Sequence, residues 1–137
     1  MLPLFVYGSL VDPAILARVC RRRVGAFPTE PATLSDHRRV YVAGAWYPTV
    51  VKCCGRRVDG LLIDGLDRDC MRRLGEYEGP EYETRARQVV GARRGKVTAR
   101  VFIARPGIRL LHQDWDPEGW AEARGRLLRN GGRAADA

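Results

Sequence analysis

The pattern that most constrains the fold lies within the first thirteen residues. Three consecutive apolar residues, Leu4–Val6, include strand-forming types and predict a short buried strand. Gly8 ends the apolar run, and Asp12 with Pro13 is typical of a helix N-cap followed by the first helical residue. Tyr7–Leu10 is therefore predicted to be a loop between a strand and a helix. Free main-chain N–H groups in such a loop can bind an anion or an oxyanion. The same residues are also compatible with an ordinary turn between a strand and a helix.

Length and composition are those of a single globular domain. The chain has 137 residues, of which 45% are hydrophobic and 29% charged. No apolar run approaches the roughly 20 residues of a membrane span, and no signal peptide is recognisable. We expect a cytoplasmic protein without membrane association. Its single domain over residues 1–137 is expected to comprise a core over 1–105, a loop and helix over 106–131, and a frayed tail over 132–137.

The positive charge does not by itself indicate a partner. The 24 basic residues exceed the 16 acidic ones, which gives a net charge of +8. All of the basic residues except Lys52 and Lys96 are arginines, and they are scattered in short runs without interleaved aromatic residues. We therefore expect no nucleic-acid partner. The charge is interpreted as a compositional bias or as an attraction for an anionic substrate.

The cysteines and histidines do not form a recognisable metal site. No two cysteines have CxxC spacing, and neither histidine, His37 or His112, lies near a cysteine cluster. We expect buried free thiols in a reducing compartment and no bound metal. The four cysteines are Cys20, Cys53, Cys54 and Cys70.

The rest of the chain alternates between β-rich and helical segments. Helices are expected over about 12–22 and from Asp67 to Leu74. Trp46 and Tyr47, next to a proline, are interpreted as core aromatics. Strands are expected over 32–34, 39–43, 47–52, 58–63, 85–91 and 97–104, with turns at Gly44, at Gly55–Arg57 and across 92–96, and with the sheet region ending at Arg105–Gly107.

A single carboxylate stands out after the second predicted helix. Gly75, Gly79 and Pro80 are expected to stop this helix, which places Glu78 just past its end, between an aromatic residue and a glycine. A carboxylate there lies near the negative end of the helix dipole, and burial would raise its pKa. A carboxyl group with a raised pKa suits a general acid/base that works near neutral pH.

Several short motifs, in this order, resemble the γ-glutamylcyclotransferase-like (AIG2-like) family. They are the Tyr-Gly-Ser-Leu loop at Tyr7–Leu10, the V-x-G-x-L strand at Val58–Leu62, the Glu-Gly pair at Glu78–Gly79, and the Tyr-x-x-Arg pattern at Tyr82 and Arg85. The resemblance covers nearly the whole chain. It implies a mixed α/β (α+β) fold, in which a small, partly closed β-barrel of about six strands has helices packed around it.

The resemblance also implies a reaction and the residues that perform it. The α-amine of a small γ-glutamyl substrate attacks its own γ-carbonyl, which releases 5-oxoproline and an amine. Glu78 is implied to be the catalytic acid/base, facing a substrate-binding loop formed by Tyr7, Gly8, Ser9 and Leu10. Tyr82 is expected to border the pocket. The resemblance also implies that an aromatic–proline pair within Trp46–Pro48 lies near the pocket, as an alternative to a core role for Trp46 and Tyr47. No metal and no organic cofactor is implied.

The sequence leaves two alternative functions open. One is an amide-directed enzyme with Ser9 or a cysteine as nucleophile, which would need a neighbouring histidine. The other is a non-catalytic member of the same fold that binds a small molecule or nucleic acid. The identity of the leaving amine and the oligomeric state are not specified by any pattern in the chain.

Overall fold

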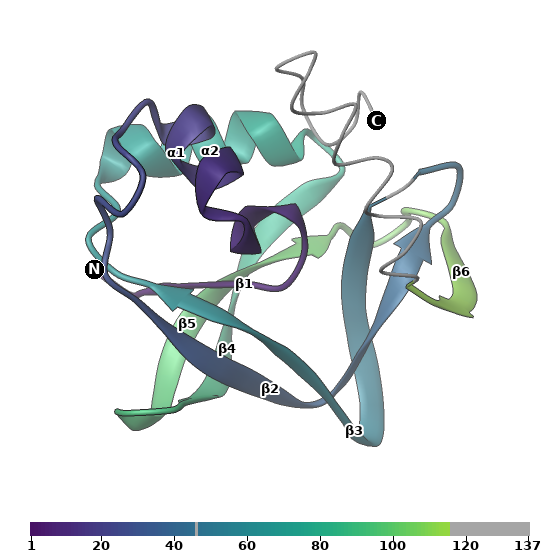
Figure 1. The fold of residues 1–137 in the computed structure, drawn as a ribbon. Coiled ribbons are helices and arrows are strands. Elements are labelled where there is room, and N and C mark those ends of the chain that lie inside the picture. The colour runs from purple at the N-terminus through teal and green to yellow at the C-terminus, as the bar shows by residue number, and fades with distance from the viewer. Residues whose placement is uncertain (46, 116–137) are drawn as a thin grey trace.

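The computed structural model describes residues 1–45 and 47–115. Figure 1 shows the two α-helices lying side by side over one end of a ring of strands. The elements in chain order are β1 (Leu4–Val6), the short 3-10 helix η1 (Ser9–Val11), α1 (Pro13–Cys20), β2 (Thr29–Val42), β3 (Pro48–Ile63), α2 (Arg68–Glu78), β4 (Tyr82–Gly91), β5 (Gly95–Ala104) and β6 (Leu110–Asp114).

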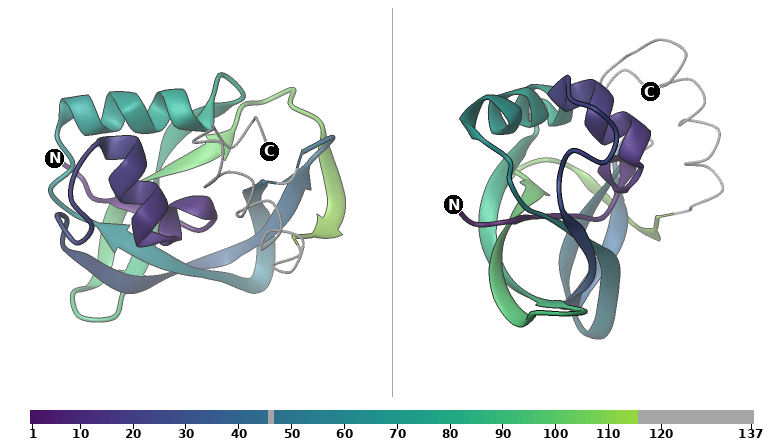
Figure 2. Two further views of the ribbon diagram at one scale, coloured as in Figure 1. Left: turned by 45° about the horizontal axis from the view of Figure 1, so that its top comes forward. Right: turned by 60° about the vertical axis from the view of Figure 1, so that its left-hand side comes forward.

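Five of the strands close into a barrel. Their order is β3-β1-β5-β4-β2, and pairing between β2 and β3 completes the ring, which is seen almost end-on in the right-hand view of Figure 2. β1 pairs parallel with β5 and antiparallel with β3, and the remaining neighbours are antiparallel. β6 lies outside the ring as an extra strand on β2. The predicted α+β barrel with flanking helices is confirmed.

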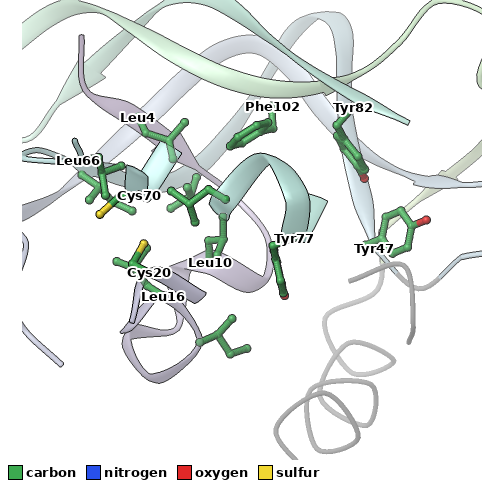
Figure 3. Packing of buried hydrophobic residues seen from close by; sticks show 14 of the residues in the cluster. Leu4, Leu10, Leu16, Cys20, Tyr47, Leu66, Cys70, Tyr77, Tyr82 and Phe102 are labelled. Carbon is green, nitrogen blue, oxygen red and sulfur yellow. The ribbon is translucent and has the colours of Figure 1, made fainter. Parts of the chain in front are cut away.

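Two hydrophobic clusters lie on opposite faces of β1. Alternate side chains of a strand point to opposite faces, so Phe5 enters the barrel whereas Leu4 and Val6 pack against the helices. This double burial explains why the short strand is apolar throughout. The inner cluster comprises Phe5, Tyr7, Ala32, Leu34, Val50, Val58, Leu62, Val89, Ala99 and Val101. The outer cluster includes Leu4, Val6, Leu10, Leu16, Cys20, Leu66, Cys70, Leu74, Tyr77, Tyr82 and Phe102 (Figure 3).

The predicted turn at Gly55–Arg57 is wrong, because β2 and β3 are two long strands rather than four short ones. β3 continues through this segment, and the pairing register with β2 shifts between Ser35 and His37. Asp36 has a φ of 56° at the shift, and its carboxylate accepts a hydrogen bond of 3.0 Å from the N–H of Gly55. The polar residues therefore form a bulge that bends the hairpin without ending it.

The helices begin where the sequence predicts but end elsewhere. Asp12 caps α1 through a hydrogen bond of 2.9 Å from the N–H of Ala14, and the helix ends at Cys20, before the left-handed residue Arg21. α2 does not end at Leu74 but continues through Gly75 to Glu78. The prediction that Glu78 follows the helix is thus wrong, because a lone glycine does not stop a helix whose other face is buried.

The segment after β5 also differs from its prediction. The sheet was expected to end at Arg105–Gly107, yet β6 pairs with Val40 and Val42 of β2. Four of the five β6 residues are exposed, so the strand has no apolar alternation that would reveal it. The hairpin of β4 and β5 follows its prediction closely. Trp46, the predicted helix within 106–131 and the frayed tail over 132–137 lie wholly or largely outside the described residues.

The cysteine prediction holds for two of the four thiols. All four are free; Cys20 and Cys70 are buried between the helices, whereas Cys53 is partly buried and Cys54 exposed. Burial raises the pKa of the Cys20 thiol to about 12. None of the helices in the described part of the chain has the length and apolar character that crossing a bilayer requires.

The barrel wall makes a specific prediction at Gly60. A Cβ built on Gly60 would overlap the main-chain oxygen of Val6 and lie 2.8 Å from Cζ of Phe5. We expect Gly60→Ala to lower the free energy of unfolding by about 2 kcal/mol or more, because main-chain atoms cannot move aside. The midpoint of urea unfolding measures the change.

Gly75 supplies the matched control. It lies within α2, and a Cβ built there meets no atom within 4 Å. Gly75→Ala should therefore stabilise the protein by about 0.5–1 kcal/mol through helix propensity and the restricted unfolded chain. Equal effects of the two substitutions would contradict the close approach at Gly60.

Candidate active site

A pocket lies where the loop after β1, the start of β3 and the end of α2 meet. Its empty space, counted out to the open mouth, is about 350 Å³, but its cavity volume is only about 20 Å³, so the pocket is narrow. The structure therefore brings together the two segments that the sequence separates by almost seventy residues. The lining residues are Phe5, Val6, Tyr7, Gly8, Ser9, Leu10, Tyr47, Pro48, Glu78 and Phe102.

The loop presents main-chain N–H groups that have no backbone partner. The carbonyls of Gly8 and Ser9 accept hydrogen bonds from Val11 and Asp12, which form the 3-10 turn η1. Within the described residues, the N–H groups of Gly8, Ser9 and Leu10 donate no such bond. A short loop with unpaired N–H groups can receive a carboxylate or an oxyanion.

The position of this loop is fixed from two sides. A Cβ built on Gly8 would lie 3.3 Å from Cγ of Pro48, so a larger residue would press against the start of β3. The Nε–H of Arg39 donates to the carbonyl of Tyr7 at 2.9 Å, and another N–H of the same guanidinium donates to the carbonyl of Asp59. Arg39 therefore ties the loop to the barrel wall.

Glu78 brings a carboxyl group to the opposite side of the pocket. It is the last residue of α2, where Gly79 takes a φ of 92° and ends the helix. Burial raises the pKa of Glu78 from 4.5 to about 8, and within the described residues no hydrogen bond or ion pair offsets that burial. The protonated and ionised forms of Glu78 are therefore both populated near neutral pH.

Tyr77 connects the helix to the loop. Its hydroxyl donates to Oγ of Ser9 at 2.7 Å, and both side chains are buried. The bond holds the last turn of α2, and hence Glu78, against the loop. Within the described residues, neither His37 nor His112 lines the pocket, so no histidine lies beside Ser9 Oγ to activate it as a nucleophile.

Two further tyrosines hold the strand segments of the pocket in place. The hydroxyl of Tyr7 donates to the carbonyl of Phe102 at 2.5 Å, and that of Tyr82 donates to the carbonyl of Pro48 at 2.7 Å. Burial raises the pKa of both phenols far above the ordinary value, and the Glu78 carboxylate raises both further. Both therefore stay protonated and act as hydrogen-bond donors.

The predicted site residues are distributed as follows. Tyr7, Gly8, Ser9, Leu10 and Glu78 all line the pocket. Tyr82 does not line the pocket. It packs beside Tyr47 with ring centroids 5.8 Å apart, and its hydroxyl donates to the carbonyl of the pocket residue Pro48. Tyr47 is both a buried aromatic and a pocket residue, so both interpretations of it hold.

Not all pocket residues were singled out from the sequence. Phe102 lies on a strand where nothing local distinguishes a pocket residue from a core residue, whereas Pro48 belongs to the aromatic–proline pair that the resemblance placed near the pocket. Tyr77 could have been found, because it directly precedes Glu78 on a helix whose buried side faces the loop. Arg85 of the Tyr-x-x-Arg motif is exposed and pairs with Glu83 at 2.6 Å, and it does not line the pocket.

The described residues contain no group of three or more His, Cys, Asp or Glu that is placed to hold a metal ion. The polar groups of the pocket are instead a carboxyl group, hydroxyl groups and main-chain amides. These groups bind organic substrates and move protons.

The barrel with its two helices is a gamma-glutamyl cyclotransferase fold. A solved structure named gamma-glutamyl cyclotransferase superposes with a TM-score of 0.64 at 15% identity, over 80% of this chain and 69% of that one. The solution structure of a protein from Arabidopsis thaliana superposes with a TM-score of 0.67 at 26% identity, over 94% of this chain and 78% of that one.

The chain belongs to the gamma-glutamyl cyclotransferase, AIG2-like family. The family model matches residues 4–119. Protein AIG2 C of Arabidopsis thaliana is 30% identical over 119 residues, which are 85% of this chain and 70% of that protein. AIG2-like protein D of the same plant is 30% identical over 121 residues, 86% of this chain and 78% of that protein. The resemblance inferred from the motifs is confirmed.

The burial of Glu78 predicts a pH-dependent stability. Its folded pKa of about 8 exceeds the ordinary value of 4.5, so the folded protein favours the protonated form. Stability is therefore lost as the pH rises from about 4.5 to about 8. Glu78→Gln should be more stable than the wild type by a margin that grows over this window and levels off above it. Thermal unfolding at several pH values measures the margin.

Glu76→Gln is the control on the same helix. The Glu76 side chain is 66% exposed and pairs with Arg72 at 2.9 Å, so its removal should produce no such growing margin. A margin for Glu78→Gln that does not change between pH 5 and pH 9 would contradict the raised pKa.

Proposed function

We propose that the protein is a γ-glutamylcyclotransferase that releases 5-oxoproline from a small γ-glutamyl amine or amide. The observation that carries this proposal is the partly buried carboxyl group of Glu78, which has no partner among the described residues and lines one small pocket together with the N–H-bearing loop Tyr7–Leu10. Family membership supports the same reaction class, as does the fold that the chain shares with the solved structure named gamma-glutamyl cyclotransferase.

The reaction is an intramolecular acyl transfer. The α-amine of the γ-glutamyl group attacks the γ-carbonyl carbon, a new C–N bond closes the five-membered ring, and the original γ-carbonyl C–N bond breaks. Because both reacting groups belong to one molecule, the enzyme has to hold the folded-back conformer and move protons. In this proposal the Glu78 carboxylate takes a proton from the attacking nitrogen and delivers it to the leaving amine, so it ends the cycle ionised.

The loop supplies the complementary charge. The N–H groups of Gly8, Ser9 and Leu10 would hold either the α-carboxylate of the substrate or the oxyanion that forms at the γ-carbonyl. The apolar walls formed by Phe5, Pro48 and Phe102 limit water in the pocket, which favours ring closure over hydrolysis. The mechanism uses neither a metal nor an organic cofactor.

The proposal also includes the cellular location, the charge of the substrate and the partners of the protein. A cytoplasmic location is supported by the four free cysteines, which suit a reducing compartment. The net charge of +8 favours an anionic substrate over a cationic one. The partner in this proposal is the small γ-glutamyl substrate itself, and no nucleic acid or membrane takes part.

The first experiment measures 5-oxoproline release from a panel of γ-glutamyl amines, γ-glutamyl dipeptides and glutathione. We expect the wild type to turn over at least one of them and Glu78→Gln to lose about 10²–10⁴-fold in kcat, because the amide cannot accept the proton. Glu76→Gln, two residues earlier and exposed, should keep the wild-type rate. No release from any substrate, or equal activity in Glu78→Gln, would refute the proposed reaction.

The second experiment measures the pH dependence of kcat/KM on the best substrate. The general base has to be ionised, so the rate should rise with pH and reach half its maximum near pH 8, the pKa of Glu78. The α-ammonium of the substrate also titrates, and its pKa is determined separately by NMR. A profile that follows only the ionisation of the substrate would contradict the role of Glu78.

One variant, Ser9→Ala, distinguishes this mechanism from catalysis by a nucleophilic serine. Ser9→Ala removes the hydroxyl and the acceptor for Tyr77 but leaves the main-chain N–H, so we expect at most about a tenfold loss in kcat. A loss as large as that of Glu78→Gln, together with a trapped acyl-enzyme, would instead support Ser9 as the nucleophile.

A further inference from the structure

A second and more open cavity lies between α2 and the strands β4 and β5. It contains about 1270 Å³ of empty space, against about 350 Å³ for the pocket at Glu78. Four arginines line it, namely Arg68 and Arg72 on α2, Arg100 on β5 and Arg105 just after β5. We call this cavity the arginine groove.

The acidic residues of the arginine groove neutralise only part of its charge. Arg72 donates to Glu76 at 2.9 Å, and Arg105 lies 3.4 Å from Glu83. Four arginines and two glutamates leave a formal excess of two positive charges among the lining residues. The excess belongs to Arg68 and Arg100, neither of which pairs with a carboxylate in the part of the chain that the structure describes.

Arg100 carries a buried donor without an acceptor. One N–H of its guanidinium reaches the carbonyl of Leu2 at 3.2 Å, whereas its Nε is buried and has no hydrogen-bond partner among the described residues. A buried N–H without an acceptor is unfavourable, and in native proteins such groups are usually satisfied by another protein group or an ordered water. Because this Nε has almost no accessible surface, an anion in the arginine groove would supply the missing acceptor only after a small shift of the Arg100 side chain.

Arg68 points to the same kind of ligand. It is exposed at the first position of α2, where a positive charge is repelled by the positive end of the helix dipole. The residue therefore does not stabilise its own helix. A bound anion would compensate both the dipole and the guanidinium, and guanidinium groups form two parallel hydrogen bonds with carboxylates and phosphates.

We propose that the arginine groove is a second binding site, which takes a small organic anion with a carboxylate or phosphate group. The anionic group would lie against Arg68 and Arg100. The organic part would contact Met71 and Phe102, which supply apolar surface to the same groove. The described interactions leave these two arginines available, so an incoming anion has no internal carboxylate to displace there.

The groove shares a wall with the candidate active site. Phe102 lines both cavities, and Tyr82 lines the groove while its hydroxyl donates to Pro48 in the pocket. Gly79, which follows Glu78 directly, also lines the groove. An anion bound there would lie next to the catalytic pocket. The binding itself does not depend on the proposed reaction, so it is tested without a substrate.

The test is an NMR titration of the ¹⁵N-labelled full chain with citrate and, separately, with inorganic phosphate, at constant ionic strength. We expect the Nε–Hε signal of Arg100 to shift in a saturable way as it gains an acceptor. Arg68→Gln should weaken binding by about tenfold, the usual effect of losing one charge-assisted hydrogen bond. Arg100→Lys keeps the charge but removes the Nε–H, and should weaken binding by a similar factor.

Arg23→Gln is the matched control for net charge. Arg23 is exposed after α1, outside the groove, and its removal lowers the net charge by the same amount as Arg68→Gln. Tighter binding of citrate would identify a carboxylate ligand, and tighter binding of phosphate a phosphorylated one; either supports the site. No saturable shift of Arg100 with either anion, or an equal loss of affinity in Arg23→Gln and Arg68→Gln, would overturn the proposal.

Discussion

The pairing of one three-residue strand holds the architecture together. β1 is hydrogen-bonded to β3 on one side and to β5 on the other, so it closes the barrel between them. Its central residue, Phe5, fills the barrel, while Leu4 and Val6 anchor the helices. Because β1 ends at Val6, the loop that follows must emerge at the barrel rim, under the end of α2. The backbone geometry that builds the two cores thus also places the loop opposite Glu78.

The candidate site combines two groups that the rest of the fold leaves unsatisfied. Glu78 is a partly buried carboxyl group without a described partner, and the loop at Gly8–Leu10 offers donors without backbone acceptors. They are held on opposite sides of one pocket by the Tyr77–Ser9 hydrogen bond and by Arg39. Groups left without partners in this way are expected where function imposes its own demands.

Local patterns predicted those elements whose signals are themselves local. The apolar run at Leu4–Val6 and the cap at Asp12 identify β1 and α1 because burial and capping leave a mark in the adjacent residues. The continuity of β3 through Gly55–Arg57 was missed, because a bulge and a turn use the same residue types. β6 was missed because an exposed edge strand is held by main-chain pairing, which leaves no alternation of apolar and polar residues in the sequence. The position of Glu78 across from the loop came from the family resemblance, since no local rule relates residues seventy positions apart.

The parallel pairing of β1 with β5 has a consequence for the order of folding. Leu4 lies opposite Arg100, so ring closure joins segments separated by almost the whole barrel sequence. On a ribosome, the apolar segment Leu4–Val6 would emerge early and wait for β3 as its first partner and for β5 as its second. Long-range parallel pairing of this kind is slow, because the entropy of closing a large loop is lost before the contacts form. The segment that organises the finished barrel is therefore the one most exposed to aggregation or chaperone capture while the chain is being made.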